Sequence, residues 1–319
     1  MFSKLKIFIL ISITTLSCSK SSIPLTETNP TVDLSPIPNT PTVIIPIPSD
    51  AESKEVALNL LKNNGDCDLP CIWGLTPGIT TSVERQKILA SYGEFSDPDF
   101  AMSGSGSDLS ENPGGFGIGL TKEQVEIFVG LNYYETENHI EILTLVSGAQ
   151  QDQKYVYGNI SYSSLLEYYT LPQLLTTYGV PSDVLVLAFP YNVFSKADYE
   201  PFSLVVIYSD LGIMAEYISP TEWIGEMVEL PTPGLSVGEI ARGCPSQSRI
   251  TIRTWDVKMN ILIKKIASIA AGEGISETAY DYFLPIQDAT FMSVDDFYNT
   301  FKEPNNEQCI ELSSRFWMP

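Results

Sequence analysis

The chain contains 319 residues, with 18 Lys and Arg against 39 Asp and Glu, so its formal net charge at pH 7 is −21. This charge argues against nucleic-acid binding, which needs clustered cations, and against adsorption to anionic lipid headgroups. Hydrophobic residues make up 44% of the chain, enough for a sizeable core. The length suggests about two globular units.

His139 is the single histidine of the chain. A histidine-rich zinc site is therefore excluded, and any Ser-His-Asp or Cys-His catalytic arrangement would have to use His139. This residue opens the alternating stretch HIEILTLV, which predicts a strand with His139 near its edge. We expect neither a cofactor nor a metal ion.

Residues 1–18, MFSKLKIFILISITTLSC, are typical of an export signal. Lys4 and Lys6 precede an apolar run from Ile7 to Leu16, and a small residue, Ser17, stands before Cys18. The apolar run is shorter than the ~20 residues that span a bilayer. The sequence therefore predicts an extracytoplasmic protein.

The small residue before Cys18 resembles the lipobox of bacterial lipoproteins. The usual lipobox has Leu, then Ala or Ser, then Gly or Ala, whereas Thr15, Leu16 and Ser17 precede the cysteine here. In that family the cysteine is acylated and becomes the new N-terminus. The resemblance implies a membrane anchor through acylated Cys18, and ordinary secretion with cleavage after Ser17 is the alternative.

Residues 19–50 carry seven of the 22 prolines, interspersed with Ser and Thr. Proline removes backbone donors and biases its neighbours to extended conformations, so this segment predicts a disordered, semi-extended tether. At ~3.1 Å per residue, such a tether could reach on the order of 90 Å. A proline-rich ligand for another domain is the alternative.

The first expected helix covers residues 49–64, with Ser49 and Glu52 as a capping box and Gly65 as its terminator. Four cysteines remain after Cys18, and an even number in an exported chain predicts two disulfides. The simplest of the three connectivities pairs the nearest cysteines in sequence, Cys67 with Cys71 and Cys244 with Cys309.

Cys67 and Cys71 could instead form a redox or metal site. A redox dithiol usually has two intervening residues at the start of a helix, whereas three residues including Asp68 and Pro70 intervene here. A metal site would need two further ligands, for which only Cys244 and Cys309 remain. A structural clasp is the favoured interpretation.

Three segments resemble one another, and each predicts a short helix that ends at a glycine and leads into strands. The residues "ILASYGEFSD" align on "LLTTYGVPSD" with an offset of 86 residues, and the third segment shares the Thr-Pro-Gly entry of the first. The expected N-caps are Thr81, Thr170 and Ser236. The segments, at 76–97, 169–183 and 232–247, are expected to end their helices at Gly93, Gly179 and Gly243.

Alternating or apolar runs after these helices predict strands, most clearly at 124–135, 139–148, 183–191, 202–210, 212–219 and 248–256. Further helices are expected at 257–271 after Asp256 and at 292–301. Residues 96–117 are rich in Gly, Ser and Asp and predict a surface loop. The expected fold class is α+β, with repeated small modules of short helices packed on antiparallel β-sheet.

The phrase "TLPQLLTTYGVPSDV" with the following strands resembles the SmpA/OmlA and β-lactamase-inhibitor-protein type of module. The phrase C-x-x-x-C-x-W-G-L-T-P-G at 67–78 is similar to uncharacterised bacterial surface lipoproteins with a Pro/Thr stalk. The first resemblance implies protein–protein contact or envelope assembly. The expected organisation is a signal and lipobox at 1–18, a tether at 19–50, and α+β modules at 51–158, 159–231 and 232–319.

These observations predict a lipid-anchored, non-catalytic module that binds an envelope or extracellular protein whose identity the sequence does not reveal. Its expected contact surface is the solvent face of the sheet, with Tyr133, Tyr134, Tyr191 and Tyr208 as candidate residues; sheet packing is the alternative role for these tyrosines.

The sequence leaves two alternative functions. A carboxylate-based enzyme acting on a wall or extracellular polymer needs two acids about 5–10 Å apart in a cleft, with Asp295, Asp296, Glu123 and Glu126 as candidates. Asp295 and Asp296 are better interpreted as charges at a helix N-terminus. A calcium-dependent surface protein is compatible with the acidity, although the sequence has no EF-hand loop pattern.

Overall fold

The structure, a computed structural model, describes residues 48–96, 100–105, 114–122, 124–136, 138–152, 154–156, 164–188, 201–229, 236–259, 261–268, 280–304 and 308–316. All of them belong to one compact unit, Ile45–Pro319. The expected signal, Cys18, most of the tether, Glu123 and Tyr191 lie outside the described residues.

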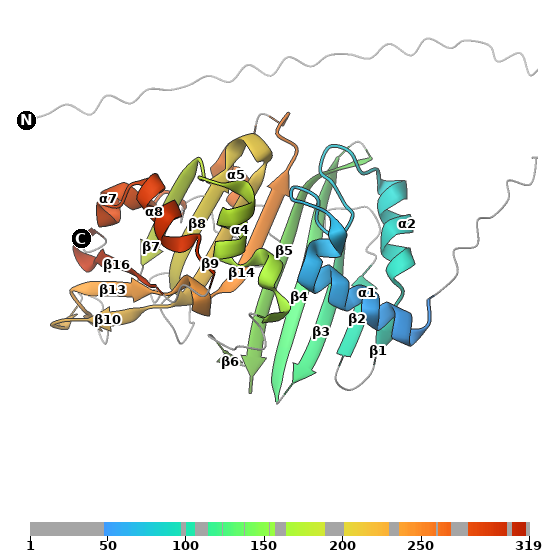
Figure 1. Ribbon diagram of the computed structural model, residues 1–319, viewed down its shortest axis with the longest axis horizontal. Helices are drawn as coiled ribbons and strands as arrows, with labels where there is room; N and C mark the ends of the chain where they lie inside the picture. Colours follow the sequence, from blue (N-terminus) through green and yellow to red (C-terminus); the bar gives the residue numbers. More distant parts are fainter. Residues whose placement is uncertain are drawn as a thin grey trace, which may run out of the picture. The chain divides into compact units, whose positions relative to one another are not determined.

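An antiparallel sheet of eleven described strands organises this unit (Figure 1). In spatial order its strands are β1 (Phe95–Ser96), β2 (Phe100–Ser105), β3 (Gly114–Lys122), β4 (Val125–Thr136), β5 (His139–Gln151), β14 (Arg249–Trp255), β9 (Ile213–Pro220), β8 (Pro201–Tyr208), β7 (Asp183–Ala188) and β15 (Leu284–Pro285), and β6 (Lys154–Tyr155) pairs with β5. The α+β fold class is thereby confirmed.

Strand β14 joins two antiparallel meanders. It pairs with β5 on one side, where Thr251 lies opposite Val146, and with β9 on the other, where Thr251 lies opposite Glu216. The three ranges expected as separate modules therefore contribute strands to the same sheet. Residues about 100 positions apart in sequence become cross-strand neighbours at this centre.

One face of the sheet packs against most of the helices. These are α1 (Asp50–Asn63), α4 (Leu171–Tyr178), α7 (Ile286–Thr290) and α8 (Val294–Phe301), with α2 (Ser82–Tyr92) beside them. In Figure 1, α1 and α4 lie across the strands. Alternate residues of β4, from Val125 to Tyr133, are buried on this face because side chains of a strand point to opposite sides in turn.

The opposite face is covered over only part of its width. Helix α5 (Ile263–Ser268) and Phe283 pack on the β7–β14 half, where they form a second apolar cluster with Ile142, Val205 and Trp255. Over β3 and β4 no described helix packs on this face, and its residues are half-buried or exposed.

Two small sheets complete the unit. Strands β10 (Glu222–Ile224), β13 (Ile240–Gly243) and β16 (Ile310–Ser313) form one, and β11 (Val228–Glu229) with β12 (Ser236–Val237) the other. The short 3-10 helices are η1 (Asn64–Asp66), η2 (Glu167–Tyr169), η4 (Ser209–Leu211), η5 (Pro245–Gln247) and η6 (Ser314–Phe316).

The prediction of a helix in the third similar segment is wrong. Residues 236–243 form β12 and β13 instead, and β13 lies between β10 and β16. Arg242 bridges Glu222 and Glu311 across this small sheet. Pairing with strands far along the chain thus overrides the local cap pattern of Ser236 and Glu239.

Other helix starts are confirmed by their caps. Ser49 with Glu52, Thr81 with Glu84, and Ser293 with Asp296 each form a reciprocal capping box, while α1 ends at a left-handed Asn64 directly before Gly65. Helix α5 begins at Ile263, not directly after Asp256. The prediction of a surface loop at 96–117 is also wrong in part, because this range contains β2 and the start of β3.

Among the described helices, none has the length and apolar character needed to cross a bilayer.

Candidate functional site

The two expected disulfides are present. Cys67 is bonded to Cys71, and Cys244 is bonded to Cys309, so the nearest-neighbour connectivity is confirmed. Disulfides persist in oxidising compartments, which indicates an extracytoplasmic location. With both sulfurs engaged in a bond, Cys67 and Cys71 form a covalent clasp in this structure.

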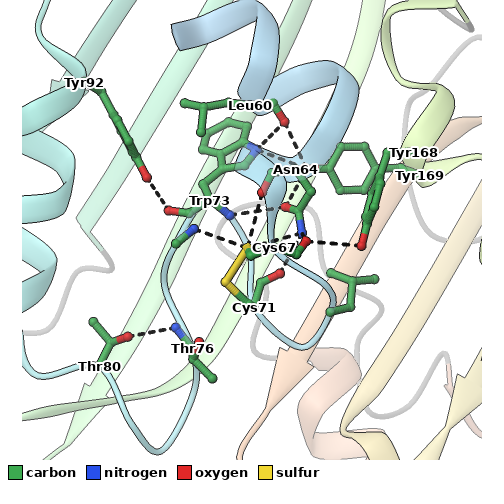
Figure 2. The surroundings of a disulfide bond; sticks show 12 residues. Leu60, Asn64, Cys67, Cys71, Trp73, Thr76, Thr80, Tyr92, Tyr168 and Tyr169 are labelled. Carbon is green, nitrogen blue, oxygen red and sulfur yellow. Dashed lines mark hydrogen bonds between the residues drawn. A yellow bond between two sulfur atoms is a disulfide. The ribbon is translucent and has the colours of Figure 1, made fainter.

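Asn64 is the centre of the polar network around this clasp (Figure 2). Its Nδ2 donates to the carbonyl oxygens of Cys67, at 2.6 Å, and Cys71, at 2.8 Å. Its Oδ1 accepts from Trp73 N at 3.2 Å and from the Tyr169 hydroxyl at 2.9 Å. The buried amide therefore uses both of its donors and both acceptor positions.

Trp73 and Tyr169 extend this network from the clasp to the η2–α4 segment. The Trp73 Nε1 donates to Leu60 O and to the Tyr169 hydroxyl, both at 3.0 Å. Both rings are fully buried. Burial raises the pKa of Tyr169 well above its ordinary value, so its hydroxyl stays neutral at physiological pH.

Three further tyrosines contact the backbone between Cys67 and Trp73. Tyr92 donates to Trp73 O at 2.5 Å, Tyr178 accepts from Leu69 N at 2.9 Å, and Tyr168 donates to Cys67 O at 3.3 Å. Burial raises the pKa of Tyr92 and of Tyr178. The neutral hydroxyls of Tyr92 and Tyr178 therefore serve here as hydrogen-bonding groups.

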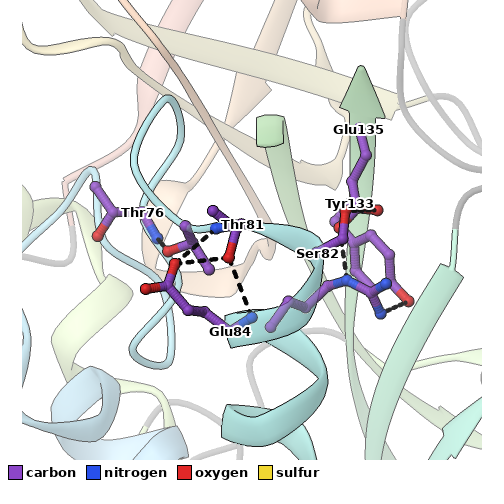
Figure 3. A network of polar contacts seen from close by, with 8 residues as sticks. Thr76, Thr81, Ser82, Glu84, Tyr133 and Glu135 are labelled. Atoms are coloured by element: carbon purple, nitrogen blue, oxygen red, sulfur yellow. Dashed lines mark hydrogen bonds and ion pairs between the residues drawn. The ribbon is translucent and has the colours of Figure 1, made fainter. Parts of the chain in front are cut away.

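A second network fixes α2 to the end of β4 (Figure 3). The Arg85 Nε lies 2.6 Å from Glu135 Oε1, and its Nη1 donates to the Tyr133 hydroxyl at 2.6 Å. Ser82 donates to the second carboxylate oxygen of Glu135 at 3.0 Å. Because the Arg85 guanidinium pairs with the Glu135 carboxylate and donates to Tyr133, these charge-assisted contacts hold the helix against the strand.

A buried charged pair lies in the middle of the large sheet. The Arg253 Nη1 of β14 donates to Glu216 Oε2 of β9 at 3.0 Å, and both side chains are fully buried. Within the described part of the chain, Nε and Nη2 of Arg253 have no hydrogen-bond partner. Sequence reasoning missed this pair because its residues lie 37 positions apart on separate strands.

The candidate carboxylates do not gather into a described site. Asp296 accepts from the Ser293 hydroxyl at 2.6 Å within the capping box of α8, Asp295 is exposed beside it, and Glu126 is exposed on β4. His139 is exposed at the first residue of β5. Among the described residues, no three His, Cys, Asp or Glu side chains are grouped as metal ligands would be.

The candidate tyrosines do not share one surface. Tyr133 and Tyr208 are buried on the helix-covered face, and the Tyr208 hydroxyl donates to Gly179 O at 2.9 Å. Tyr134 is exposed on the opposite side, because neighbouring residues of a strand face opposite ways. Tyr133 and Tyr208 are therefore packing residues, and Tyr134 alone of the three described tyrosines is available for contact.

The open part of the sheet around Tyr134 is built largely from glycine. Gly117 of β3 pairs with Gly130 of β4, and a Cβ added at Gly119 or Gly130 would meet no described atom within 4 Å. Phe128 lies over Gly148 of β5, where a side chain would overlap its ring. We call this surface, formed by Gly115, Gly117, Gly119, Glu126, Phe128, Gly130, Asn132 and Tyr134, the open face.

The open face could have been found in the sequence. In "GGFGIGL", residues 114–120, glycine alternates with apolar residues, which is a strand pattern with a buried side and a side without side chains. Its first four residues, 114–117, were expected to belong to a loop because glycine is also a turn residue.

Comparisons of the chain with protein-family models, with curated proteins and with solved structures found no match.

Proposed function

We propose that this protein is a lipid-anchored, non-catalytic module outside the cytoplasm that binds another protein through the open face. The observation that supports this contact surface is that Tyr134 is exposed beside paired strands with several outward-facing glycines. The export signal and Cys18 support the anchor, and residues 19–50 support a tether between the anchor and the folded unit.

The chemistry of the open face favours a protein partner. Aromatic side chains give large contact area at low conformational cost, and tyrosine adds a hydroxyl that can bind the polar rim of a partner. Glycine positions let a partner approach the strand backbone closely. The polar networks around Asn64, Arg85 and Asp296 are occupied by internal contacts, which supports a packing role for them.

Photo-crosslinking in intact cells tests this proposal. A photoreactive benzoylphenylalanine replaces Tyr134 in the full-length protein, and the matched control carries it at Tyr282, because both side chains are 43% exposed. We expect one defined envelope or extracellular protein to be captured from position 134 and not from position 282. Equal capture from both positions, or none from either, would contradict the proposed surface.

A Cys18→Ala variant tests the anchor separately. Without the acylated cysteine, the protein should move from the membrane fraction to the soluble extracytoplasmic fraction, because the chains that hold it in the bilayer are lost. Mass spectrometry of the native N-terminus should find a diacylglycerol on Cys18. An unmodified N-terminus at Cys18 would support ordinary secretion instead.

A further inference from the structure

Four loops at one end of the large sheet each present an exposed aliphatic side chain. They are residues 76–80, before α2; 179–182, between α4 and β7; 209–212, between β8 and β9; and 256–259, after β14. We call this surface the loop edge. Its aliphatic residues are Ile79 (70% exposed), Val180 (47%), Leu211 (42%) and Val257 (50%).

Hydrogen bonds connect the second loop to the third. The Ser182 hydroxyl oxygen accepts from Ser209 N at 2.9 Å, and the same Ser182 hydroxyl donates to Ile207 O at 2.8 Å. The Tyr208 hydroxyl donates to Gly179 O at 2.9 Å. Val180 and Leu211 therefore project from two loops that are held against each other.

Two glycines allow the third, fourth and first loops to meet. A Cβ at Gly212 would overlap Trp255 O and lie 3.0 Å from Val257 Cγ1, and a Cβ at Gly78 would overlap the Asp256 carboxylate. Both glycines have positive φ, 67° and 73° respectively, which other residues rarely adopt. The four loops thus form a continuous line of contacts across the sheet end.

The aliphatic residues are not required by the turns themselves. Turns favour Gly, Asn, Asp, Ser and Pro, and the described backbone bonds of these loops, such as Gly78 N to Ile140 O at 2.7 Å, do not depend on an aliphatic side chain. Single exposed aliphatic residues are common on protein surfaces, whereas an adjoining set on fixed loops marks an interaction surface.

Acidic side chains surround this apolar line. Asp210 adjoins Leu211, Asp256 adjoins Val257, Asp183 begins β7, and Glu84 lies on the first turn of α2. Two lysines oppose these four acids, Lys258 in the fourth loop and Lys87, which interacts electrostatically with Glu84, so acidic side chains outnumber the lysines here. A surface of this sign repels anionic lipid headgroups, and it repels the identical surface of a second copy. It complements a partner with Lys or Arg beside its apolar residues.

We propose that the loop edge binds a protein segment in which an apolar side chain is flanked by Lys or Arg. The apolar residue would contact Leu211 and Val257, and the cations would pair with the surrounding carboxylates. Because the hydrogen-bonded loops are already ordered, little conformational entropy is lost on binding. This inference adds a contact surface to the proposed function and does not depend on the open face.

The test uses the full-length protein in intact cells with benzoylphenylalanine at Ile79. The captured peptide is mapped by mass spectrometry, and capture is repeated in Leu211→Ser/Val257→Ser. The matched control is Met227→Ser/Tyr282→Ser, which removes side chains that are 51% and 43% exposed and do not belong to the four loops. Since all four positions are exposed, both double variants should fold, which circular dichroism checks.

We expect position 79 to capture a peptide with net positive charge and an apolar residue, with yield falling about fivefold or more in Leu211→Ser/Val257→Ser and less than about twofold in the control. A lipid adduct, a crosslink to a second copy, or an acidic peptide would overturn the proposal. So would equal yields from both double variants, or no product. Capture at position 79 without capture at position 134 would separate this surface from the open face.

Discussion

Replacement of Asn64 by alanine tests whether the clasp network stabilises the fold. The change removes hydrogen bonds to Cys67 O, Cys71 O, Trp73 N and the Tyr169 hydroxyl. Tyr169 keeps Leu60 O as a partner at 3.3 Å, and Cys67 O keeps the Tyr168 hydroxyl at 3.3 Å. Trp73 N and Cys71 O lose the amide that satisfied them.

The expected loss follows from these two groups and from the backbone. A buried polar group without its partner costs about 1–3 kcal/mol, which gives about 2–6 kcal/mol for the two. Asn64 also has a left-handed backbone, with φ of 57°, which alanine adopts less readily than asparagine at a cost of about 1 kcal/mol. We therefore expect Asn64→Ala to lower the free energy of unfolding by about 3–7 kcal/mol.

Urea denaturation followed by tryptophan fluorescence measures this difference, since Trp73 is buried beside Asn64. The matched control is Asn63→Ala, which removes one exposed hydrogen bond to Asn59 and should change stability by less than about 0.5 kcal/mol. If the two variants have the same denaturation midpoint with unchanged slope, the network does not stabilise the fold and the reasoning is refuted.

Further predictions concern the second disulfide, the central ion pair and a buried tyrosine. Cys244 and Cys309 lie 65 positions apart, so changing both to alanine should lower the free energy of unfolding by about 4 kcal/mol in urea titrations. An unchanged free energy of unfolding would contradict a stabilising role for this disulfide. Glu216→Leu should cost about 3–5 kcal/mol because it leaves Arg253 buried without a counter-ion, and adding Arg253→Met should recover most of that loss. Burial raises the pKa of Tyr280 to about 12. Between pH ~10 and pH ~12 the folded state therefore keeps a proton that the unfolded chain has lost. The free energy of unfolding should fall as the pH rises through this window, and it should fall less steeply in Tyr280→Phe.

Local signals in the sequence were sufficient where the structure depends on neighbouring residues. The capping boxes at Ser49, Thr81 and Ser293 start helices as expected, since each cap bonds residues within three positions. The alternation in 124–135 and 139–148 identified β4 and β5 for the same reason. The nearest-neighbour pairing of the cysteines also required no knowledge of the fold.

The same local signals failed where a distant partner decides the conformation. The segment 236–243 has a cap pattern typical of a helix, but pairing of β13 with β10 and β16 makes it a strand. Residues 100–105 and 114–117 were expected in a loop because their glycines and serines favour turns, yet β2 and β3 pair there through backbone bonds that need no side chain.

The candidate surfaces likewise depend partly on local signals in the sequence and partly on contacts between distant residues. From the sequence came the expectations of an export signal, of a lipid anchor at Cys18, of a tether and of a sheet with an exposed side. The alternation put Tyr133 and Tyr134 on opposite faces of a strand, but only the tertiary structure showed that helices cover the face of Tyr133 and leave Tyr134 exposed. Only tertiary structure brings Val180, Leu211, Val257 and Ile79 together, since the order of strands in space, set by long-range packing, decides which loops adjoin.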